Sequence, residues 1–277
     1  MFSVLMSIYK NDRVDFLEEA LDSLLNQAIY PEQIVLVKDG PVGKDLGLIV
    51  EKFKGLFSVL GVDFFIHTIK ENVGLGLALQ SGLDFCTGEY IVRMDSDDIS
   101  TENRILMIKE FANNNPSVDI FGSYIEEFNI CLGDQGLIRK VPLDNEQIAS
   151  YSKKRNPMNH VTVCFRKKSI QLTGGYEDVL YHEDYYLWLK SIKYGLTLAN
   201  IPFVTVYVRA GGGMVGRRHG LTYLKCEYNF VKKAVKLNSF NYIEAINYLL
   251  PRLVIRFIHK KILLSFYTFF LRSKEGG

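Results

Sequence analysis

The sequence is short of the features that mark several functional classes. Its four cysteines form no Cys-x-x-Cys pair and no zinc-ligand spacing, so we expect reduced thiols in a cytosolic protein. A formal net charge of only +2 provides no strong field to recruit nucleic acid, and we expect no nucleic-acid partner. No uncharged apolar run reaches the roughly 18 residues that a transmembrane helix needs. The first residues lack the basic start and long apolar core of a signal peptide, and predict a strand instead.

What the sequence does contain is a regular alternation of predicted strands and helices over its first 128 residues. Apolar runs rich in β-branched and aromatic residues predict strands at 2–9, 33–40, 63–70, 89–95 and 118–128. Apolar residues at helical spacing predict helices at 16–25, 46–57, 76–86 and 101–115. Because the strands are continuously apolar, helices should cover both of their faces. We therefore predict a doubly wound, mostly parallel α/β sheet.

The alternation weakens after residue 130. Strands are predicted at 161–167 and 204–209, and a tyrosine-rich helix at 183–194. From residue 220 the pattern predicts helical structure to the end of the chain. The sequence contains no internal repeat and no low-complexity linker.

Three polar clusters follow predicted strands: Tyr9–Arg13, Asp39 and Asp95–Asp98. In a doubly wound sheet, ligands bind beyond the carboxyl ends of the strands. We therefore expect these clusters to converge on one edge of the sheet and to form a binding site there.

The segment “RMDSDDIS” places three carboxylates within four positions, directly after an apolar run. A surface turn is one interpretation. A phosphatase nucleophile would need Thr two positions after its second Asp, and a calcium loop would need Gly where Ile stands at position 99. A Mg²⁺ or Mn²⁺ site is the other interpretation, because such ions commonly use one or two carboxylates together with phosphate oxygens. Asp95 and Asp97 would then serve the site. Asp98 would be a local turn or cap acid, with Ser100 or Thr101 starting the next helix.

Two acids, Glu183 and Asp184, open the tyrosine-rich helix. Acidic side chains favour the first turn of any helix because they complement its dipole. Alternatively, aromatic surroundings raise the pKa of one carboxyl and make it a general base. Asp39, in “LVKDGP”, likewise fits either an Asp-Gly turn or a carboxylate that accepts hydrogen bonds from a base or ribose.

The segment “VRAGGGMVGRRHG” combines a glycine-rich hinge with four basic side chains, Arg209, Arg217, Arg218 and His219. Arginines can hold a pyrophosphate, although an exposed basic turn fits equally well. His160 precedes a strand and is either a satisfied core residue or a site residue. “KENVGLGLALQSGL” lacks the third glycine of a dinucleotide fingerprint, because Leu stands at position 79, and Gly82 is expected to aid helix packing.

In this order the segments resemble the family 2 glycosyltransferases of the GT-A fold, in the bacterial branch that builds capsular, lipopolysaccharide or exopolysaccharide chains. The resemblance extends from residue 1 to about 220. It rests on eight segments, “SVLMSIYKNDRVDFLEEALDSLLNQ”, “QIVLVKDGP”, “KENVGLGLALQSGL”, “GEYIVRMDSDDIS”, “NHVTVCFRKKSI”, “GGY”, “HEDYYLWLK” and “GGGMVGRR”. Each segment alone is weak, and their common order makes the resemblance specific.

The resemblance implies roles at the donor nucleotide-sugar. Ser7 and Tyr9 would flank the nucleotide, and Asp39 would hold the uracil or ribose. Asn72 would lie beside the donor. Asp95 would contact both the donor and a divalent metal.

It also implies the remaining site residues. Asp97 would bind the metal, Mn²⁺ or Mg²⁺. Asp184, paired with Glu183, would be the catalytic base. Arg217 and Arg218 would add to the donor-binding set, and two histidines, His160 and His219, are further candidates.

From this resemblance we expect an inverting, metal-dependent glycosyltransferase. It would move a sugar from a nucleotide-sugar, a UDP-sugar, to a hydroxyl of a growing glycan or lipid-linked oligosaccharide. Residues 1–220 would form the GT-A domain, with a nucleotide-sugar half (1–128) and an acceptor and catalytic half (129–220), followed by a helical extension (221–277). The alternatives are a non-catalytic sugar-nucleotide-binding or scaffold subunit, and a sugar nucleotidyltransferase. The latter would carry a glycine-rich loop after its first strand, where this chain has “SIYKNDR”.

The C-terminal segment 251–274 places Arg252, Arg256 and Lys260 four residues apart, beside many apolar side chains. Such a basic stripe suits an amphipathic helix on an anionic bilayer, while a core-packed helix with a solvated basic face is the alternative. The expected location is the cytoplasm, with peripheral attachment to the inner face of the plasma membrane if the stripe binds lipid.

Overall fold

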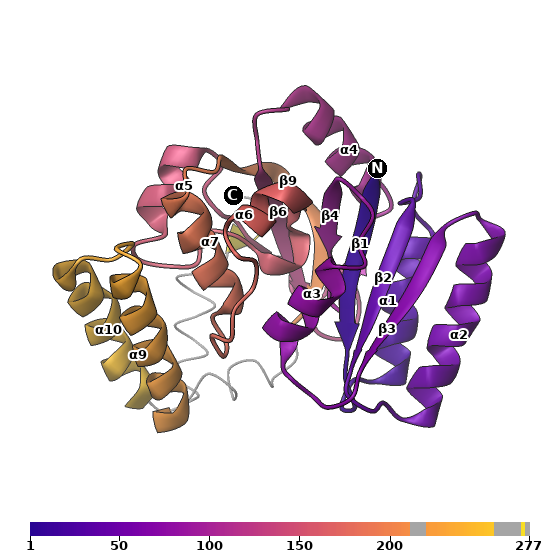
Figure 1. The fold of residues 1–277 in the computed structure, drawn as a ribbon, viewed down its shortest axis with the longest axis horizontal. Coiled ribbons are helices and arrows are strands. Elements are labelled where there is room, and N and C mark those ends of the chain that lie inside the picture. The colour runs from indigo at the N-terminus through magenta and orange to yellow at the C-terminus, as the bar shows by residue number, and fades with distance from the viewer. Residues whose placement is uncertain (211–219, 258–272, 275–277) are drawn as a thin grey trace.

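The first 128 residues alternate between strands and helices, as the sequence predicts (Figure 1). The computed structural model describes residues 1–210, 220–257 and 273–274. The strands of this part are β1 (Phe2–Ile8), β2 (Gln33–Asp39), β3 (Asp63–Ile69), β4 (Tyr90–Arg93), the short β5 (Ile99–Ser100) and β6 (Ile120–Phe128). The helices are α1 (Val14–Leu25), α2 (Lys44–Val59), α3 (Leu75–Leu83) and α4 (Arg104–Asn114).

The later part of the chain is less regular, also as predicted. Its strands are β7 (Leu137–Arg139), β8 (Cys164–Arg166), β9 (Leu198–Arg209) and β10 (Ser273–Lys274). Its helices are α5 (Asn145–Tyr151), the single 3₁₀ turn η1 (His160–Thr162), α6 (Lys167–Leu172), α7 (Glu183–Lys193), α9 (Gly220–Lys236) and α10 (Tyr242–Phe257). The expectation of helix to the very end is wrong, because β10 pairs antiparallel with β7.

All the strands join one mixed sheet, and its parallel part forms the edge that carries the site. The order is β10-β7-β6-β8-β4-β1-β2-β3, with β9 beside β6 and β5. β1 lies parallel between β2 and β4, with Ser3 opposite both Gln33 and Ile91. β8 and β9, from the second predicted half, belong to this same sheet. Because the two predicted halves share one sheet, the division at residue 128 remains a proposal about function.

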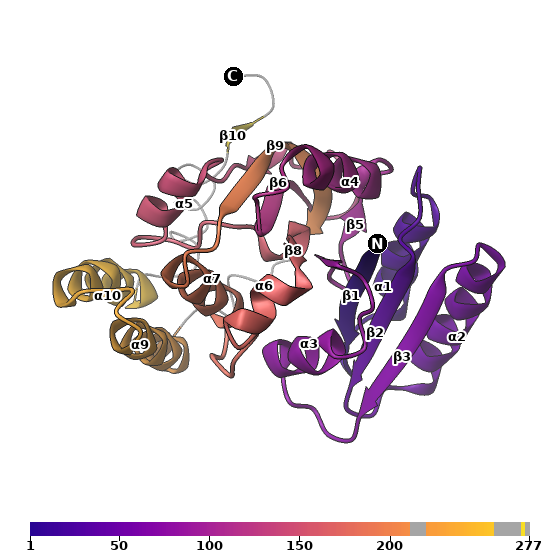
Figure 2. The ribbon, with the colours of Figure 1, turned by 45° about the horizontal axis from the view of Figure 1, so that its top comes forward.

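Helices cover both faces of the sheet (Figures 1 and 2). On one face α1, α2 and α4 bury an apolar core that includes Leu17 and Ile105. On the other, α3, α5, α6 and α7 bury a second core around Leu79 and Trp188. α9 and α10 lie beyond α7, at one end of the molecule, and pack onto it through a third apolar cluster around Phe230. The continuously apolar strands follow from this double cover, because both faces of the sheet lose contact with water.

The start of α4 differs from the prediction. Its N-cap residue is Asn103, which makes no side-chain capping hydrogen bond, so neither Ser100 nor Thr101 starts the helix. Ser100 instead lies in β5, opposite Val206 of β9. Pairing with β9 keeps the chain extended past the position where local sequence favours a cap.

Gly82 allows α3 to lie close to the sheet, as predicted. A Cβ at this position would lie 2.6 Å from Leu5 Cδ1 and 2.6 Å from Val37 Cγ2, and both of those side chains are fully buried. By contrast, a Cβ on Gly55, within α2, would meet no atom within 4 Å.

We expect Gly82→Ala to lower the free energy of unfolding by about 1–3 kcal/mol, because the added methyl group overpacks a rigid core. Gly55→Ala, also inside a helix, should instead be neutral or stabilise by up to about 1 kcal/mol, because alanine is the better helix former. Urea unfolding of both variants measures the difference. Equal stability of the two would contradict the close approach at Gly82.

Candidate active site

The carboxyl ends of β1, β2 and β4 bring the predicted donor residues to one edge of the sheet. Ser7 lies in β1 opposite Val37 of β2, so Tyr9 and Asp39 follow neighbouring strand ends. β4 ends at Arg93 beside Leu5 of β1, and Asp95 follows it at the same edge. Parallel pairing alone accounts for this convergence, and it agrees with the expectation from the sequence.

Asp39 organises the loop that leads into α3. Its side chain is buried, and it accepts hydrogen bonds from the backbone N–H groups of Val73 and Gly74 at 2.7 and 3.0 Å. The side-chain amide of Asn72 also donates to it, at 2.9 Å. Asp39 and Asn72, predicted separately as donor residues, therefore contact each other and fix one loop. Gly74 has φ +90°, which glycine adopts without strain.

The three carboxylates of “RMDSDDIS” converge closely. Asp95, Asp97 and Asp98 each offer an oxygen, and these oxygens all lie within 4.8 Å of one another. Asp97 is exposed, yet loss of part of its surrounding water, followed by the charges of Asp95 and Asp12, raises its pKa to about 6. Burial, and then the charges of its two neighbours, raises the pKa of Asp98 well above its ordinary value.

Asp98 does not act as the local turn or cap acid that the sequence suggests. It is buried, and it accepts the backbone N–H of Arg209 at 2.9 Å. Arg209 also donates from Nε to the carbonyl oxygen of Asp97 at 3.3 Å and pairs with Glu19. Its guanidinium carbon lies 3.9 Å from the centre of the Phe16 ring. Arg209, considered above with the arginines for pyrophosphate, thus ties β9 to the acidic loop.

Asp12 is a site residue that the sequence reasoning missed. Its side chain accepts the Tyr9 N–H at 3.1 Å and the Ser96 hydroxyl at 2.9 Å. Burial raises the pKa of Asp12, and the charge of Asp95 adds to this effect. The two hydrogen bonds oppose it in part. Asp12 lies in the polar run after β1 that the sequence places at this edge, but no predicted role singled it out. Only the fold shows that it lies close enough to Asp95 and Asp97 for their charges to interact.

A buried arginine adjoins the same carboxylates. Arg93 is 1% exposed and pairs with Asp95. Within the described residues, its Nε and Nη1 atoms have no hydrogen-bond partner. Its charge also acts on Glu183, Asp184 and His160.

Glu183 and Asp184 form the second acidic group, in the first turn of α7. Burial, and then the charge of Asp184, raises the pKa of Glu183 to about 7. Burial also raises the pKa of Asp184, against hydrogen bonds from the Asn156 side chain and the Tyr185 N–H, both at 2.6 Å. Glu183 packs against α3. A Cβ added to Gly76 of α3 would lie 2.9 Å from the Cβ of Glu183.

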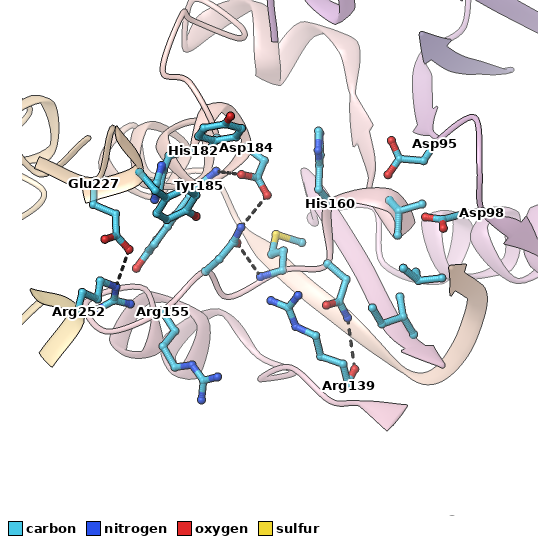
Figure 3. Close-up of a pocket in the computed structure, with 18 of the residues that line it drawn as sticks. Asp95, Asp98, Arg139, Arg155, His160, His182, Asp184, Tyr185, Glu227 and Arg252 are labelled. Carbon is cyan, nitrogen blue, oxygen red and sulfur yellow. Dashed lines mark hydrogen bonds and ion pairs between the residues drawn. The ribbon is translucent and has the colours of Figure 1, made fainter. Parts of the chain in front are cut away.

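A cavity of about 310 Å³ connects the two acidic groups (Figure 3). Asp95 and Asp98 line one part of it, and Asp184 lines another, whereas Glu183 is not among its lining residues. His160 lies between them and bonds through Nε2 to the Tyr176 hydroxyl at 2.8 Å. Burial, and then the charge of Arg93, lowers the pKa of His160, so the imidazole is neutral. His160 is therefore a half-buried residue that is held by Tyr176 and also faces the cavity.

The structure does not describe the remaining predicted residues. Arg217, Arg218 and His219 are outside the described residues, as are Lys260 and the side chain of Arg256.

Arg252 does not belong to an exposed basic stripe, because it lines the cavity and lies 3.6 Å from Glu227. On the opposite face α10 exposes apolar side chains, among them Ile243, Ile246 and Leu250. The described helices include none long and apolar enough to cross a bilayer. Membrane contact of the C-terminal segment stays a prediction.

The three clustered carboxylates suit a hard divalent cation. Oxygen ligands are those that Mg²⁺ and Mn²⁺ prefer. Burial, and then mutual repulsion, raises the pKa of Asp97 and Asp98, and a cation between the carboxylates would relieve that repulsion.

Comparison with known proteins identifies the family of the chain. The family model described as “Glycosyl transferase family 2” matches residues 3–180. The chain is 36% identical to a UDP-Gal:alpha-D-GlcNAc-diphosphoundecaprenol beta-1,3-galactosyltransferase of Escherichia coli, over 96% of this chain and 97% of that protein. It is 34% identical to the amylovoran biosynthesis glycosyltransferase AmsE of Erwinia amylovora, over 96% and 98%.

A similar fold is found in the mannosyltransferase PcManGT from Pyrobaculum calidifontis, solved with GDP-Man and Mn²⁺. The TM-score is 0.61 at 16% identity, covering 95% of this chain and 72% of that one.

The fold and the family match together define a glycosyltransferase with a GT-A fold. The chain belongs to glycosyl transferase family 2.

The half-buried acidic pair that opens α7 should make stability depend on pH. Glu183 has a folded-state pKa of about 7, above its ordinary value of 4.5, so its ionisation destabilises the folded chain as pH rises through this interval. Glu183→Gln should therefore raise Tm at pH 8 in EDTA by roughly 2–4 °C or more, the shift that about 1 kcal/mol causes in a protein of this size. The gain should shrink as pH falls from 7 to 4.5.

Thermal unfolding at pH 5 and pH 8 measures this effect. The exposed Glu110 provides the control, and Glu110→Gln should leave Tm unchanged at both pH values. If Glu183→Gln melted below the parent chain at pH 8, the conclusion that ionised Glu183 destabilises the folded chain would be wrong.

Proposed function

We propose that this chain is an inverting, metal-dependent transferase that moves a sugar from a UDP-sugar to a hydroxyl of a lipid-linked sugar, in bacterial surface polysaccharide synthesis. The observation that carries the proposal is that three carboxylates from two separate elements, Asp95, Asp98 and Asp184, line one cavity. Asp95 and Asp98 come from the loop after β4, and Asp184 comes from α7. The E. coli relative, whose name states a UDP-Gal donor and a diphosphoundecaprenol-linked acceptor, supports the donor and acceptor classes.

In this proposal the donor binds at the edge formed by β1, β2 and β4. Ser7 and Tyr9 flank the nucleotide. Asp39 accepts hydrogen bonds from the uracil or ribose through carboxylate lone pairs that its hydrogen bonds to the loop leave unused. Asn72 lies beside the donor, held by its hydrogen bond to Asp39. Arg217 and Arg218 belong to the same donor-binding set.

Asp95 and Asp97 would hold the metal, Mn²⁺ or Mg²⁺. Bound there, the ion would neutralise the charge that develops on the departing nucleoside diphosphate. Arg93 pairs with Asp95 and so holds that carboxylate in place.

Asp184 acts as the general base in this proposal. It takes the proton from the acceptor hydroxyl, and the oxygen attacks the anomeric carbon on the face opposite the nucleotide. The hydrogen bond from Asn156 fixes the carboxylate and favours its ionised form, while burial raises its pKa toward the range in which a base is effective. Glu183 lies next to it in the chain, and burial, followed by the charge of Asp184, raises the pKa of Glu183 to about 7.

We expect Asp184→Asn to lower turnover about 10²- to 10⁴-fold, the usual range for loss of a general base, with nearly unchanged donor binding. Turnover is measured as release of UDP from a panel of UDP-sugars with a GlcNAc-diphosphate-lipid acceptor. Asp178→Asn, which changes an exposed acid six positions earlier, should retain full activity. Full activity of Asp184→Asn would rule out the base assignment.

Asp97→Ala should abolish the metal-dependent part of donor binding. In the parent chain, UDP with Mn²⁺ should raise Tm, because a ligand that binds only the folded state stabilises it, and EDTA should remove that gain. Asp84→Ala, at an exposed acid after α3, should behave like the parent chain. If UDP stabilised the parent chain equally with Mn²⁺ and with EDTA, the metal assignment would be wrong.

A further inference from the structure

An exposed tyrosine lines the cavity close to the proposed base. Tyr181 lies in the turn that leads into α7, and 45% of its surface is exposed. It lines the same cavity as Asp184, which follows three positions later in the chain. The Cα atoms of the two residues are therefore at most about 11 Å apart. The proposed transfer mechanism gives the Tyr181 ring no role.

The backbone of Tyr181 has a conformation that tyrosine rarely adopts. Its φ is +65°, which is costly for a bulky residue. The N–H of His182 donates to the carbonyl oxygen of Val179 at 2.7 Å, so Tyr181 takes the third position of a four-residue turn. Glycine or asparagine usually occupies that position when φ is positive. Strained backbone persists where the surrounding packing enforces it, and it concentrates at binding sites. The fold therefore keeps this exposed ring at the cavity against its local preference.

A series of ring contacts supports Tyr181 from behind. Its ring stacks on that of Tyr223 in α9, with ring centres 5.3 Å apart and planes 27° apart. Tyr223 contacts His182 at 5.7 Å between ring centres, and His182 stacks on the fully buried Phe230 at 4.9 Å. Tyr223 is itself buried, so Tyr181 is the exposed end of this series. A ring held in this way binds a ligand with little further loss of conformational freedom.

The Tyr181 ring belongs to the side of the cavity where the proposed mechanism requires the acceptor. In Figure 3, Asp184 and His182, the neighbour of Tyr181 in the chain, lie on one side of His160. The carboxylates that follow β4 lie on the other side, where the metal and the donor nucleotide are proposed to bind. A molecule packed against Tyr181 is therefore next to the base and separate from the nucleotide.

The chemistry of this corner suits a sugar ring. The face of a tyrosine ring is apolar and carries partial negative charge. A pyranose presents a face of C–H groups, whose hydrogens are slightly positive, and a rim of hydroxyl groups. Its C–H face can pack on Tyr181 while the hydroxyls meet Asp184 and Asn156, which also line the cavity. A phosphate would gain nothing from the negative ring face, and a lipid chain would leave the polar groups without hydrogen bonds.

We propose that Tyr181 is the stacking platform for the sugar ring of the acceptor and directs one acceptor hydroxyl toward Asp184. Tyr223 is a positioning residue that supports this platform. The inference rests on the proposed function and deepens it, because it names the residue that recognises the acceptor sugar. Since α9 carries Tyr223, the helical extension takes part in acceptor recognition and does more than pack on α7.

The test measures binding of two probes to the full chain by calorimetry. One probe is GlcNAc joined to citronellol through a diphosphate, and the other is citronellyl diphosphate, which lacks the sugar. UDP first saturates the donor site, and Mn²⁺ is kept equimolar with UDP so that free metal does not bind the probes. Tyr181→Gly should weaken binding of the GlcNAc probe roughly 10-fold, the effect of losing a well-packed ring, and leave binding of the sugar-free probe unchanged. Tyr181→Phe keeps the ring and should stay within about twofold of the parent chain.

Glycine at position 181 separates ligand contact from structural packing. It adopts a positive φ without strain, so Tyr181→Gly should fold with a Tm close to that of the parent chain. Tyr30→Gly removes a ring of similar exposure, 40%, outside the cavity and should leave binding of both probes unchanged. If Tyr181→Gly lowered Tm strongly but bound the GlcNAc probe as the parent does, the ring would serve only to pack on Tyr223, and the proposal would be wrong.

The two probes and UDP also identify what the ring contacts. Equal weakening of both probes by Tyr181→Gly would assign the ring to the lipid or the diphosphate. Weaker binding of UDP with Mn²⁺ would assign it to the donor. Either result contradicts the proposal.

The outcomes separate this inference from the proposed function. A parent chain that does not bind UDP with Mn²⁺, or binds UDP but not the GlcNAc probe, would overturn the donor or the acceptor class of the proposed function. A parent chain that binds both, with Tyr181→Gly equal to it, would overturn only the inference. Tyr181→Asn, which also tolerates a positive φ, should show the same loss and keeps the test valid if Tyr181→Gly fails to fold.

Discussion

The acidic centre of this protein depends on one buried cation. Arg93 is almost completely enclosed, and its charge acts on the carboxylates after β4 and on the pair that opens α7. Carboxylates brought this close would repel one another and lose their hydration, which favours their protonated forms. A guanidinium stays charged even when buried, so Arg93 can offset both groups of acids at once. Removing it would leave buried negative charge uncompensated, which is far more costly than losing a surface ion pair.

The position of Arg93 is itself fixed by a second buried arginine. Arg104, at the start of α4, donates to the carbonyl oxygen of Val161 at 2.8 Å and also to that of Arg93. Burial, and the charge of Arg93 among other influences, lowers the pKa of Arg104 to about 10. The two arginines thus hold β4 against the segment that leads to β8. The late start of α4 places Arg104 at its first turn, so the departure from the predicted helix cap is part of how the site is built.

Much of the donor edge could be predicted because it depends on short-range order. Continuous apolar runs identify β1 to β4, and parallel pairing then brings Asp39 and Asp95 together without further information. Asp12, Asn156 and Tyr181 could not be found in this way, because each acts through a partner far away in the chain. Asn156, for example, meets Asp184 only after α7 has packed against the sheet. Asp98 was misassigned for the same reason, since its partner is the backbone of β9.

The two halves of the site are joined mechanically through α3. At its amino end, Asp39 accepts the N–H groups of Val73 and Gly74, so the donor edge fixes where the helix begins. Two residues later, Gly76 lies against Glu183, in a space that would not admit a Cβ. A displacement of the loop at Asp39 must therefore reach the first turn of α7, where Asp184 lies. Rigid packing of this kind transmits small shifts because neither side can yield without a clash. The two glycines of “NVGLG” thus differ from those of a nucleotide fingerprint. Gly74 adopts a positive φ at the end of the loop, and Gly76 lets α3 lie close to α7, the helix that carries the proposed base.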